Sequence, residues 1–296
     1  MHESSETANP PLLLFHGLLS SPQEFGLVAN PLKIHGVAHH ALSTPGYTAG
    51  SGETVLDWRA WQKNASAVVG EQVVNNQPVI LGGLCIGGIL AATVALEKRH
   101  PIAGLVLISP TFTYDGWGMS LIRHWRHIGY WTGLDHFFSV AEREPYGVKN
   151  PKIRKWVRQE LEQRALSAVG PTKVPLRALR EAERMMANVR QRLGELDCPL
   201  LVIHSREDEI TRIESVKQLF DDLPLRNKEL VILENSYHMV TIDNDRRQVA
   251  DLLSRFVKQI GDQNLTVGSS AVIPECHTSA ETQATETAIN PIFNPC

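Results

Sequence analysis

Short apolar runs alternate along the chain with longer stretches in which apolar residues recur at helical spacing. Several of the runs have no polar position, as expected for strands that are buried on both faces of a parallel sheet. We predict strands at Leu12–Phe15, Val37–Leu42, Val79–Leu81, Leu105–Ile108, Leu200–His204 and Glu229–Leu233. The predicted helices between them are Thr54–Asn75, Ile86–His100, Ile213–Asp222 and Asp245–Ile260. The alternation indicates an α/β protein with a doubly wound, mostly parallel sheet, in which ligands bind at the carboxyl ends of the strands.

One segment interrupts this rhythm. Residues 111–195 hold several helix-like stretches and no clear strand, so we expect a helical cap inserted into a core made of residues 11–110 and 196–260. The cap has 15 Lys and Arg against 9 Asp and Glu, whereas the whole chain has 29 against 32. Such a cationic surface is commonly a solvated face, but it also suits an anionic partner. Residues 1–10 and 261–296 are mostly polar or small, and we expect a flexible N-terminus and a disordered tail there.

The composition narrows the class of protein further. A net charge of -3 and 43% hydrophobic residues are typical of a soluble globular protein and give no signal for nucleic acid. The first residues do not form a basic and apolar leader, and no apolar run reaches the roughly 18 residues that a membrane span needs. The four cysteines lack the spacing of a metal site or of a disulfide framework. We therefore expect a cytoplasmic protein without a metal or a cofactor.

The stretch GGLCIGG at residues 82–88 joins an apolar run to a helical pattern. Where a strand turns sharply into a helix, the central residue is strained above the sheet, and the residues two positions on either side must be small. Gly83 and Gly87 occupy these positions around Cys85. The following helix directs its free N–H groups at Cys85 and favours its thiolate, which predicts a nucleophile. Two other interpretations stay open, a small buried cysteine in a turn and a phosphate-binding loop, although the usual phosphate motifs are missing.

A nucleophile on such a turn needs an acid and then a histidine, in this order along the chain and each after a strand. Asp208 follows the run LLVIH, and His238 follows the run ELVILE at the carboxyl end of the last strand. Glu207 and Glu209 flank Asp208 and are alternative acids, of which we prefer Asp208.

The first strand ends in His16-Gly17, and this position suggests an oxyanion hole. Gly17 permits a turn that directs the N–H of Leu18 into the site, and the N–H of Ile86, next to Cys85, is the second candidate donor. One strong donor of this kind is worth about 2.7–4 kcal/mol in catalysis. Phe25 and Met239 are candidate pocket walls by their positions alone.

Together these elements resemble the α/β-hydrolase superfamily over about residues 11–260. The segment LSTPGYTAGSGETVLDWRAWQKNA is similar to one in bacterial carboxylesterases and monoacylglycerol-lipase-like proteins. The resemblance implies the α/β-hydrolase fold, the triad Cys85, Asp208 and His238, and the oxyanion hole of Leu18 and Ile86. Those bacterial proteins usually have serine in place of Cys85. The GxCxGG box is similar to that of dienelactone hydrolases, which lack a helical cap, and of polyhydroxyalkanoate synthases, which use acyl-CoA thioesters.

A cysteine nucleophile makes a thioester intermediate, which stays activated toward thiols, alcohols and amines. We expect a hydrolase that cleaves carboxylic esters or thioesters through an acyl-cysteine. The alternative is an acyltransferase that receives its acyl group from CoA or an acyl carrier protein at the cationic cap, and a third interpretation is a non-catalytic ligand-binding protein. The cap aromatics suit an acyl or aromatic substrate, or equally the core of the cap itself. They are Trp117, Trp125, Tyr130, Trp131, Phe137 and Phe138.

Overall fold

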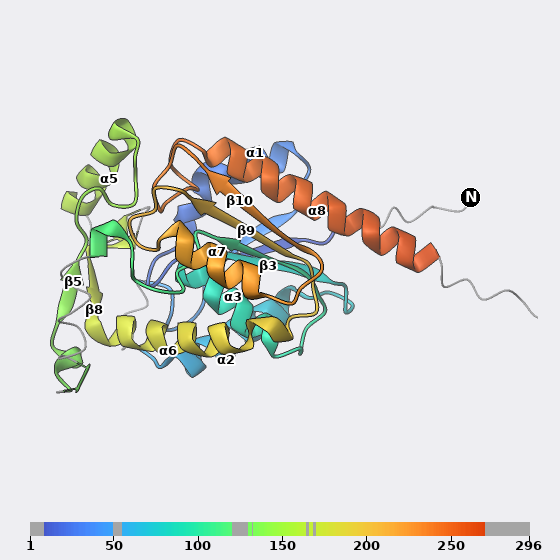
Figure 1. Cartoon of the computed structure of the whole chain (residues 1–296), viewed down its shortest axis with the longest axis horizontal. Coiled ribbons are helices and arrows are strands. Elements are labelled where there is room, and N and C mark those ends of the chain that lie inside the picture. Colours follow the sequence, from blue (N-terminus) through green and yellow to red (C-terminus); the bar gives the residue numbers. More distant parts are fainter. Residues whose placement is uncertain are drawn as a thin grey trace, which may run out of the picture.

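A computed structural model describes residues 9–49, 55–119, 130–131, 133–163, 166–167 and 170–269. A six-stranded sheet forms the centre of the molecule (Figure 1). Every pair of neighbouring strands in it is parallel, and the strand order is β10-β9-β4-β3-β1-β2. The strands are β1 (Leu12–Phe15), β2 (His39–Leu42), β3 (Val79–Leu84), β4 (Ile102–Ile108), β9 (Leu200–Ser205) and β10 (Lys228–Leu233).

All six predicted strands are present, and the prediction of a parallel α/β fold is confirmed. The bounds of β1 are those predicted, and β2 begins two residues later than expected, at His39 rather than Val37. By contrast, β3 continues past Leu81 through Gly82 and Gly83, which pair with both neighbouring strands. Glycine is a weak strand former, and for this reason the predicted strand ends at Leu81, before the two glycines.

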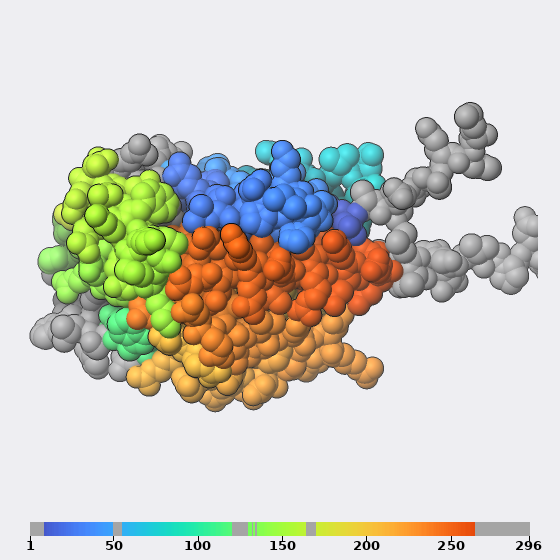
Figure 2. All heavy atoms as spheres, turned by 90° about the horizontal axis from the view of Figure 1, so that it is seen from above, coloured from blue at the N-terminus to red at the C-terminus, as the bar shows by residue number. Residues whose placement is uncertain are grey.

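Helices cover both faces of the sheet. On one face α1 (Gly26–Ile34) and α8 (Arg246–Ser269) run side by side (Figures 1 and 2). The other face is covered by α2 (Trp58–Gln72), α3 (Ile86–Leu96) and α7 (Ile213–Asp222). Every residue of α3 is buried, since this helix lies between the sheet and an outer layer of helices.

Two helix predictions need correction. The helix α1 was not predicted, because Pro31 lies within it and interrupts the helical pattern. The helix α8 continues to Ser269, past the predicted end at Ile260, because Gly261 weakens a helix but does not stop it. A side-chain carbon at Gly261 would lie 2.0 Å from Asn9 Oδ1, so the glycine also allows the N-terminal segment to pass close to the helix.

The insertion at residues 111–195 also differs from the expected helical cap. It contains two antiparallel strand pairs, so the expectation that it has no strand is wrong. These strands have only two or three residues, which is too short for an alternating pattern to be recognised in the sequence. The strands are β5 (Ser139–Ala141), β8 (Lys173–Pro175), β6 (Leu166–Ser167) and β7 (Gly170–Pro171). Its two longer helices are α5 (Pro151–Gln163) and α6 (Leu176–Arg192).

The helix α6 belongs to the core and not to the cap. Ala178, Ala182, Met185 and Val189 are fully buried in the hydrophobic cluster that also contains α2 and α3. The predicted cap therefore ends in the structure before α6. Short 3-10 turns occur at Pro22–Phe25, Trp117–Met119, Leu134–His136 and Leu193–Glu195.

None of the described helices is both long and apolar enough to cross a bilayer. We expect residues 1–10 and 261–296 to be flexible, and most of these residues, 1–8 and 270–296, lie outside the described part of the chain. Trp125 lies outside it as well.

Candidate active site

Cys85 lies at the carboxyl end of β3, on the sharp turn into α3. Its backbone has φ 57° and ψ −123°, a strained conformation for a residue with a side chain. A Cβ on Gly83 would lie 2.3 Å from the carbonyl carbon of Gly87, and one on Gly87 would lie 2.2 Å from the carbonyl oxygen of His16. Both predicted glycines are therefore needed, because any side chain would collide with backbone.

The sulfur of Cys85 can be reached from a pocket at this edge of the sheet. The residue is half-buried, and it lines the pocket together with Ile86 and His238. Its Sγ lies 3.3 Å from Oγ1 of Thr111, which is fully buried after β4. The thiol of Cys85 is therefore accessible from the pocket, and it contacts the Thr111 hydroxyl in the loop after β4.

His238 and Asp208 form a buried pair beside Cys85. Nδ1 of His238 donates to Oδ2 of Asp208 at 2.7 Å. Oδ1 of Asp208 accepts from the backbone N–H groups of Ile210 at 2.8 Å and Thr211 at 2.9 Å, so the carboxylate is fixed within its own loop. The other two candidate acids do not contact the ring. Glu207 pairs with Lys149 at the surface, and Glu209 accepts from the backbone N–H of His238.

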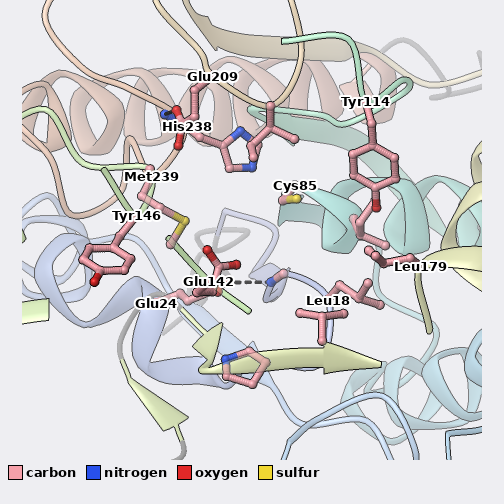
Figure 3. A pocket seen from close by; sticks show the side chains of 16 residues that line it. Leu18, Glu24, Cys85, Tyr114, Glu142, Tyr146, Leu179, Glu209, His238 and Met239 are labelled. Carbon is pink, nitrogen blue, oxygen red and sulfur yellow. Dashed lines mark hydrogen bonds between the residues drawn. The ribbon is translucent and has the colours of Figure 1, made fainter. Parts of the chain in front are cut away.

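The electrostatics of this pair favour a charged imidazole. Burial opposes the ionisation of Asp208, but the adjacent His238 lowers the pKa of Asp208 below its ordinary value. Burial also opposes the charge on His238, yet the Asp208 carboxylate and then Cys85 raise the pKa of His238 well above its ordinary value. The second ring nitrogen, Nε2, is buried and has no oxygen or nitrogen partner among the described residues. Figure 3 shows this ring facing the side of the pocket that holds the Cys85 sulfur.

The two predicted oxyanion donors lie on the same pocket. Leu18 and Ile86 both line it. Ile86 is the first residue of α3, so its N–H has no partner one turn earlier in the helix. The N–H of Gly17 donates to Oε2 of Glu24 at 2.6 Å, and this bond fixes the loop that carries Leu18. His16 is fully buried, and burial lowers its pKa to about 4, so it acts as a neutral support of the loop.

The structure places one of the candidate substrate residues, Phe25, Met239 and the cap residue Trp117, at the pocket. Met239 lines it. Phe25 is buried among the residues of α1 and α8 and does not line the pocket. Trp117 is 53% exposed, and its ring N–H donates to the Glu207 carbonyl. The prediction for Phe25 rests on its position after the first strand and that for Trp117 on the aromatic character of the cap, but tertiary packing decides where each side chain lies.

Most of the described cap aromatics are exposed rather than packed into a core of the cap. Trp131, Phe137 and Phe138 are 89%, 81% and 56% exposed. None of the described cap aromatics lines the pocket.

Other residues complete the pocket, which has a volume of about 120 Å³. The apolar walls come from both the core and the insertion, and they include Tyr114, Tyr146, Val174, Leu179 and Ile210. Three carboxylic acids also line it, Glu24, Glu142 and Glu209 (Figure 3). The sequence predicts Glu209 only as an alternative to Asp208, and it indicates no role for Glu24 or Glu142.

A buried carboxylate attaches the insertion to the loop of His238. The carboxylate of Asp243 accepts from the backbone N–H groups of Tyr237, Lys149 and Asn150 at 2.9, 2.6 and 2.9 Å. The N–H of Met239 donates to the carbonyl of Gly147 at 2.8 Å. The loop that carries His238 is therefore positioned partly by the insertion, a link that no local sequence signal indicates.

A parallel sheet with a sharp strand-to-helix turn after β3 and an acid–histidine pair after β9 and β10 is the arrangement of the α/β-hydrolase fold. A family model described as "Serine aminopeptidase, S33" matches residues 7–245. The chain belongs to this family, and it is an α/β-hydrolase that resembles carboxylesterases and monoacylglycerol lipases.

Individual relatives agree with this placement. The chain is 26% identical over 187 residues to a thermostable monoacylglycerol lipase of Bacillus sp. (strain H-257), in a match that covers 62% of this chain and 65% of that lipase. It is 21% identical over 260 residues to a carboxylesterase of Bacillus subtilis (strain 168), covering 84% of this chain and 92% of the esterase. Among solved structures, a soluble variant of monoglyceride lipase from Saccharomyces cerevisiae superposes with a TM-score of 0.73 at 14% identity, covering 87% of this chain and 88% of the other. A Paleococcus ferrophilus monoacylglycerol lipase gives 0.68 at 17% identity, covering 85% and 96%.

Proposed function

We propose that the protein hydrolyses carboxylic esters or thioesters through an acyl-cysteine intermediate. The observation that carries this proposal is the meeting of Cys85 with the Asp208–His238 pair in one pocket, from three separate loops. The likeness to proteins named as carboxylesterase and monoacylglycerol lipase supports an ester substrate. The apolar walls of the pocket suit an acyl chain.

In the proposed mechanism the Cys85 thiolate attacks the carbonyl carbon of the ester. The backbone N–H groups of Leu18 and Ile86 stabilise the developing oxyanion. His238 then donates its proton to the leaving group, and later accepts one from the water that cleaves the thioester. Asp208 keeps Nδ1 protonated and leaves Nε2 for these proton transfers.

A second candidate function is acyl transfer, and Cys85 itself favours it. A thioester keeps its acyl group activated, so transfer to an acceptor other than water is easier than from a serine ester. In this version CoA or an acyl carrier protein delivers the acyl group near the cationic insertion. A free nucleophilic thiol persists most readily in a reducing compartment, and we propose a cytoplasmic location on this ground.

Acyl trapping followed by intact-mass measurement tests the proposal. The protein is mixed with p-nitrophenyl esters or acyl-CoAs, and the modified peptide is identified. We expect one acyl group on Cys85, which water releases if the protein is a hydrolase and which persists until an acceptor is added if it is a transferase.

The chain provides a matched control for this experiment. Cys198 is the other described free cysteine, and burial raises its pKa to about 11, so it is a poor nucleophile. Cys198→Ala should therefore acylate like the unmodified protein, whereas Cys85→Ala should not acylate. Absence of acylation by every ester and thioester would favour a ligand-binding protein instead.

A further inference from the structure

The three carboxylic acids of the pocket come from three distant parts of the chain. Glu24 lies in the turn after β1, Glu142 follows β5 in the insertion, and Glu209 follows β9. Figure 3 shows Glu24 and Glu142 close together and Glu209 beside His238. Each of the three interacts electrostatically with His238. The fold therefore gathers these acids from separate elements around one pocket, with Glu24 and Glu142 as neighbours, and they do not come from a local charge run.

No basic side chain balances these acids. Among the 16 residues that line the pocket, His238 is the only one that can carry a positive charge. Within the described part of the chain, none of the three forms an ion pair with Lys or Arg. Glu24 and Glu209 each accept a backbone N–H, and burial raises the pKa of each to about 7. Burial of its carboxyl group raises the pKa of Glu142 to about 7 as well, although the residue as a whole is exposed.

An acidic pocket of this kind favours one class of ligand. Carboxylates accept hydrogen bonds, and an ammonium group has three donors and no acceptor. A phosphate or carboxylate on the ligand would meet like charges, which excludes the anionic part of CoA from the pocket itself. The ligand must also approach Nε2 of His238, which is buried, lacks an oxygen or nitrogen partner in the described residues and faces the pocket.

We propose that the acyl group on Cys85 is transferred to a primary amine, which Glu142 and Glu209 bind as its ammonium ion beside His238. This inference rests on the proposed acyl-cysteine, and it specifies the acceptor. Glu24 contributes negative charge beside Glu142, and its hydrogen bond from the Gly17 N–H keeps the loop of Leu18 in place.

The chemical step balances without a further reagent. The bound ammonium ion loses one proton to a carboxylate, which later passes it to solvent. The free amine nitrogen attacks the thioester carbonyl, so a C–N bond forms and the C–S bond breaks. Nε2 of His238 takes the second proton from nitrogen and returns it to the departing Cys85 sulfur. The products are an amide and the free thiol.

Product partition tests the inference. The protein is supplied with p-nitrophenyl butyrate together with n-butylamine or with 1-butanol, which has the same chain and no charge. Mass spectrometry then measures amide, butyl ester and butyric acid, with the uncatalysed products of a Cys85→Ala sample subtracted. We expect amide to exceed butyl ester by at least tenfold and to saturate with amine concentration.

Variants of the insertion locate the amine site. Glu142→Gln should lower the ratio of amide to acid about tenfold, as expected for loss of a hydrogen bond to a charged group. The control is Glu144→Gln, because Glu144 is two residues away, is exposed and pairs with Arg158, and this change should leave the ratio unaltered. The ratio is measured within one sample, so a variant that folds incompletely still reports it.

The outcomes separate the two proposals. If Cys85 is not acylated, the proposed function fails. If Cys85 is acylated but yields only acid, or if butanol is used as well as butylamine, only the amine acceptor is wrong. An unchanged ratio in Glu142→Gln would also overturn it.

Discussion

The pocket has two sides that are constructed differently. On the sheet side, Cys85, Asp208 and His238 each follow a parallel strand, so the register of the sheet brings them to one edge. On the insertion side, Glu142 follows a short strand, Gly147 lies in a turn, and Leu179 lies near the start of α6. The sheet side is fixed by repeated backbone hydrogen bonds between strands. The insertion is attached to the loop of His238 by a few bonds, those of the Asp243 carboxylate and the bond from Met239 N–H to the Gly147 carbonyl.

Two neighbouring acids after β9 have pKa values shifted in opposite directions, according to what each one faces. Asp208 is buried, but a histidine and two backbone N–H groups stabilise its charge and lower its pKa. Its neighbour Glu209 is buried as well, but it faces the insertion and the Asp208 charge, and its pKa is raised to about 7. We infer that the sheet side performs the covalent chemistry and that the insertion side selects what enters.

The largest expected effect comes from removing the charge on the sheet side. Asp208→Asn should lower kcat by a factor of the order of 10⁴, because the neutral amide no longer holds His238 in the tautomer that leaves Nε2 free. The measurement is kcat with a p-nitrophenyl ester. Glu207→Gln is the control, since Glu207 pairs with Lys149 at the surface and its loss should change kcat less than threefold. An equal loss in both variants would show that the acid is misassigned.

The next effect tests how rigidly the sheet side is packed. Gly87→Ala should destabilise the fold by about 3 kcal/mol or more, because its methyl group would lie 2.2 Å from the carbonyl oxygen of His16. Gly26→Ala is a matched control, since no heavy atom lies within 4 Å of a Cβ there and the helix should gain up to about 1 kcal/mol. Urea unfolding followed by circular dichroism gives both values. Similar stabilities for the two variants would mean that the turn can relax.

The contrast between the two sides explains what the sequence could predict. The strands, the glycines around Cys85 and the order of Cys85, Asp208 and His238 follow local rules, because a strand-to-helix turn and a parallel sheet fix their positions together. Which of the adjacent residues Glu24 and Phe25 lines the pocket is decided by packing alone. The sequence predicts Phe25, but in the structure Glu24 lines the pocket.

The structure of the insertion could be predicted least well from the sequence. Its strands are too short to show a period, and α6 is an amphipathic helix whose apolar face fits a cap or a core equally well. Glu142 follows such a strand, and no pattern in its surroundings marks it as part of a pocket.

A smaller effect concerns the link between the two sides at Glu24. Its folded pKa of about 7 lies above the ordinary value of 4.5, so the folded protein holds this proton more tightly and loses stability as pH rises from about 4.5 to about 7. Glu24→Gln keeps an acceptor for the Gly17 N–H and should reduce this loss by an amount of the order of 1–3 kcal/mol. Unfolding at pH 5 and pH 8 measures it, with Glu144→Gln as an exposed control. If Glu24→Gln loses as much stability as the unmodified protein, Glu24 is ionised without penalty.

The smallest effect concerns substrate choice on the insertion side. Leu179→Ala enlarges the apolar wall and should raise kcat/KM for p-nitrophenyl octanoate relative to acetate by about three- to tenfold, as one missing side chain in an apolar pocket does. Trp117→Ala removes a larger side chain, but one that is half-exposed and outside the pocket, so the same ratio should change less than twofold. If Trp117→Ala changed chain-length preference more than Leu179→Ala, the exposed aromatics of the insertion would have to close over the substrate when it binds.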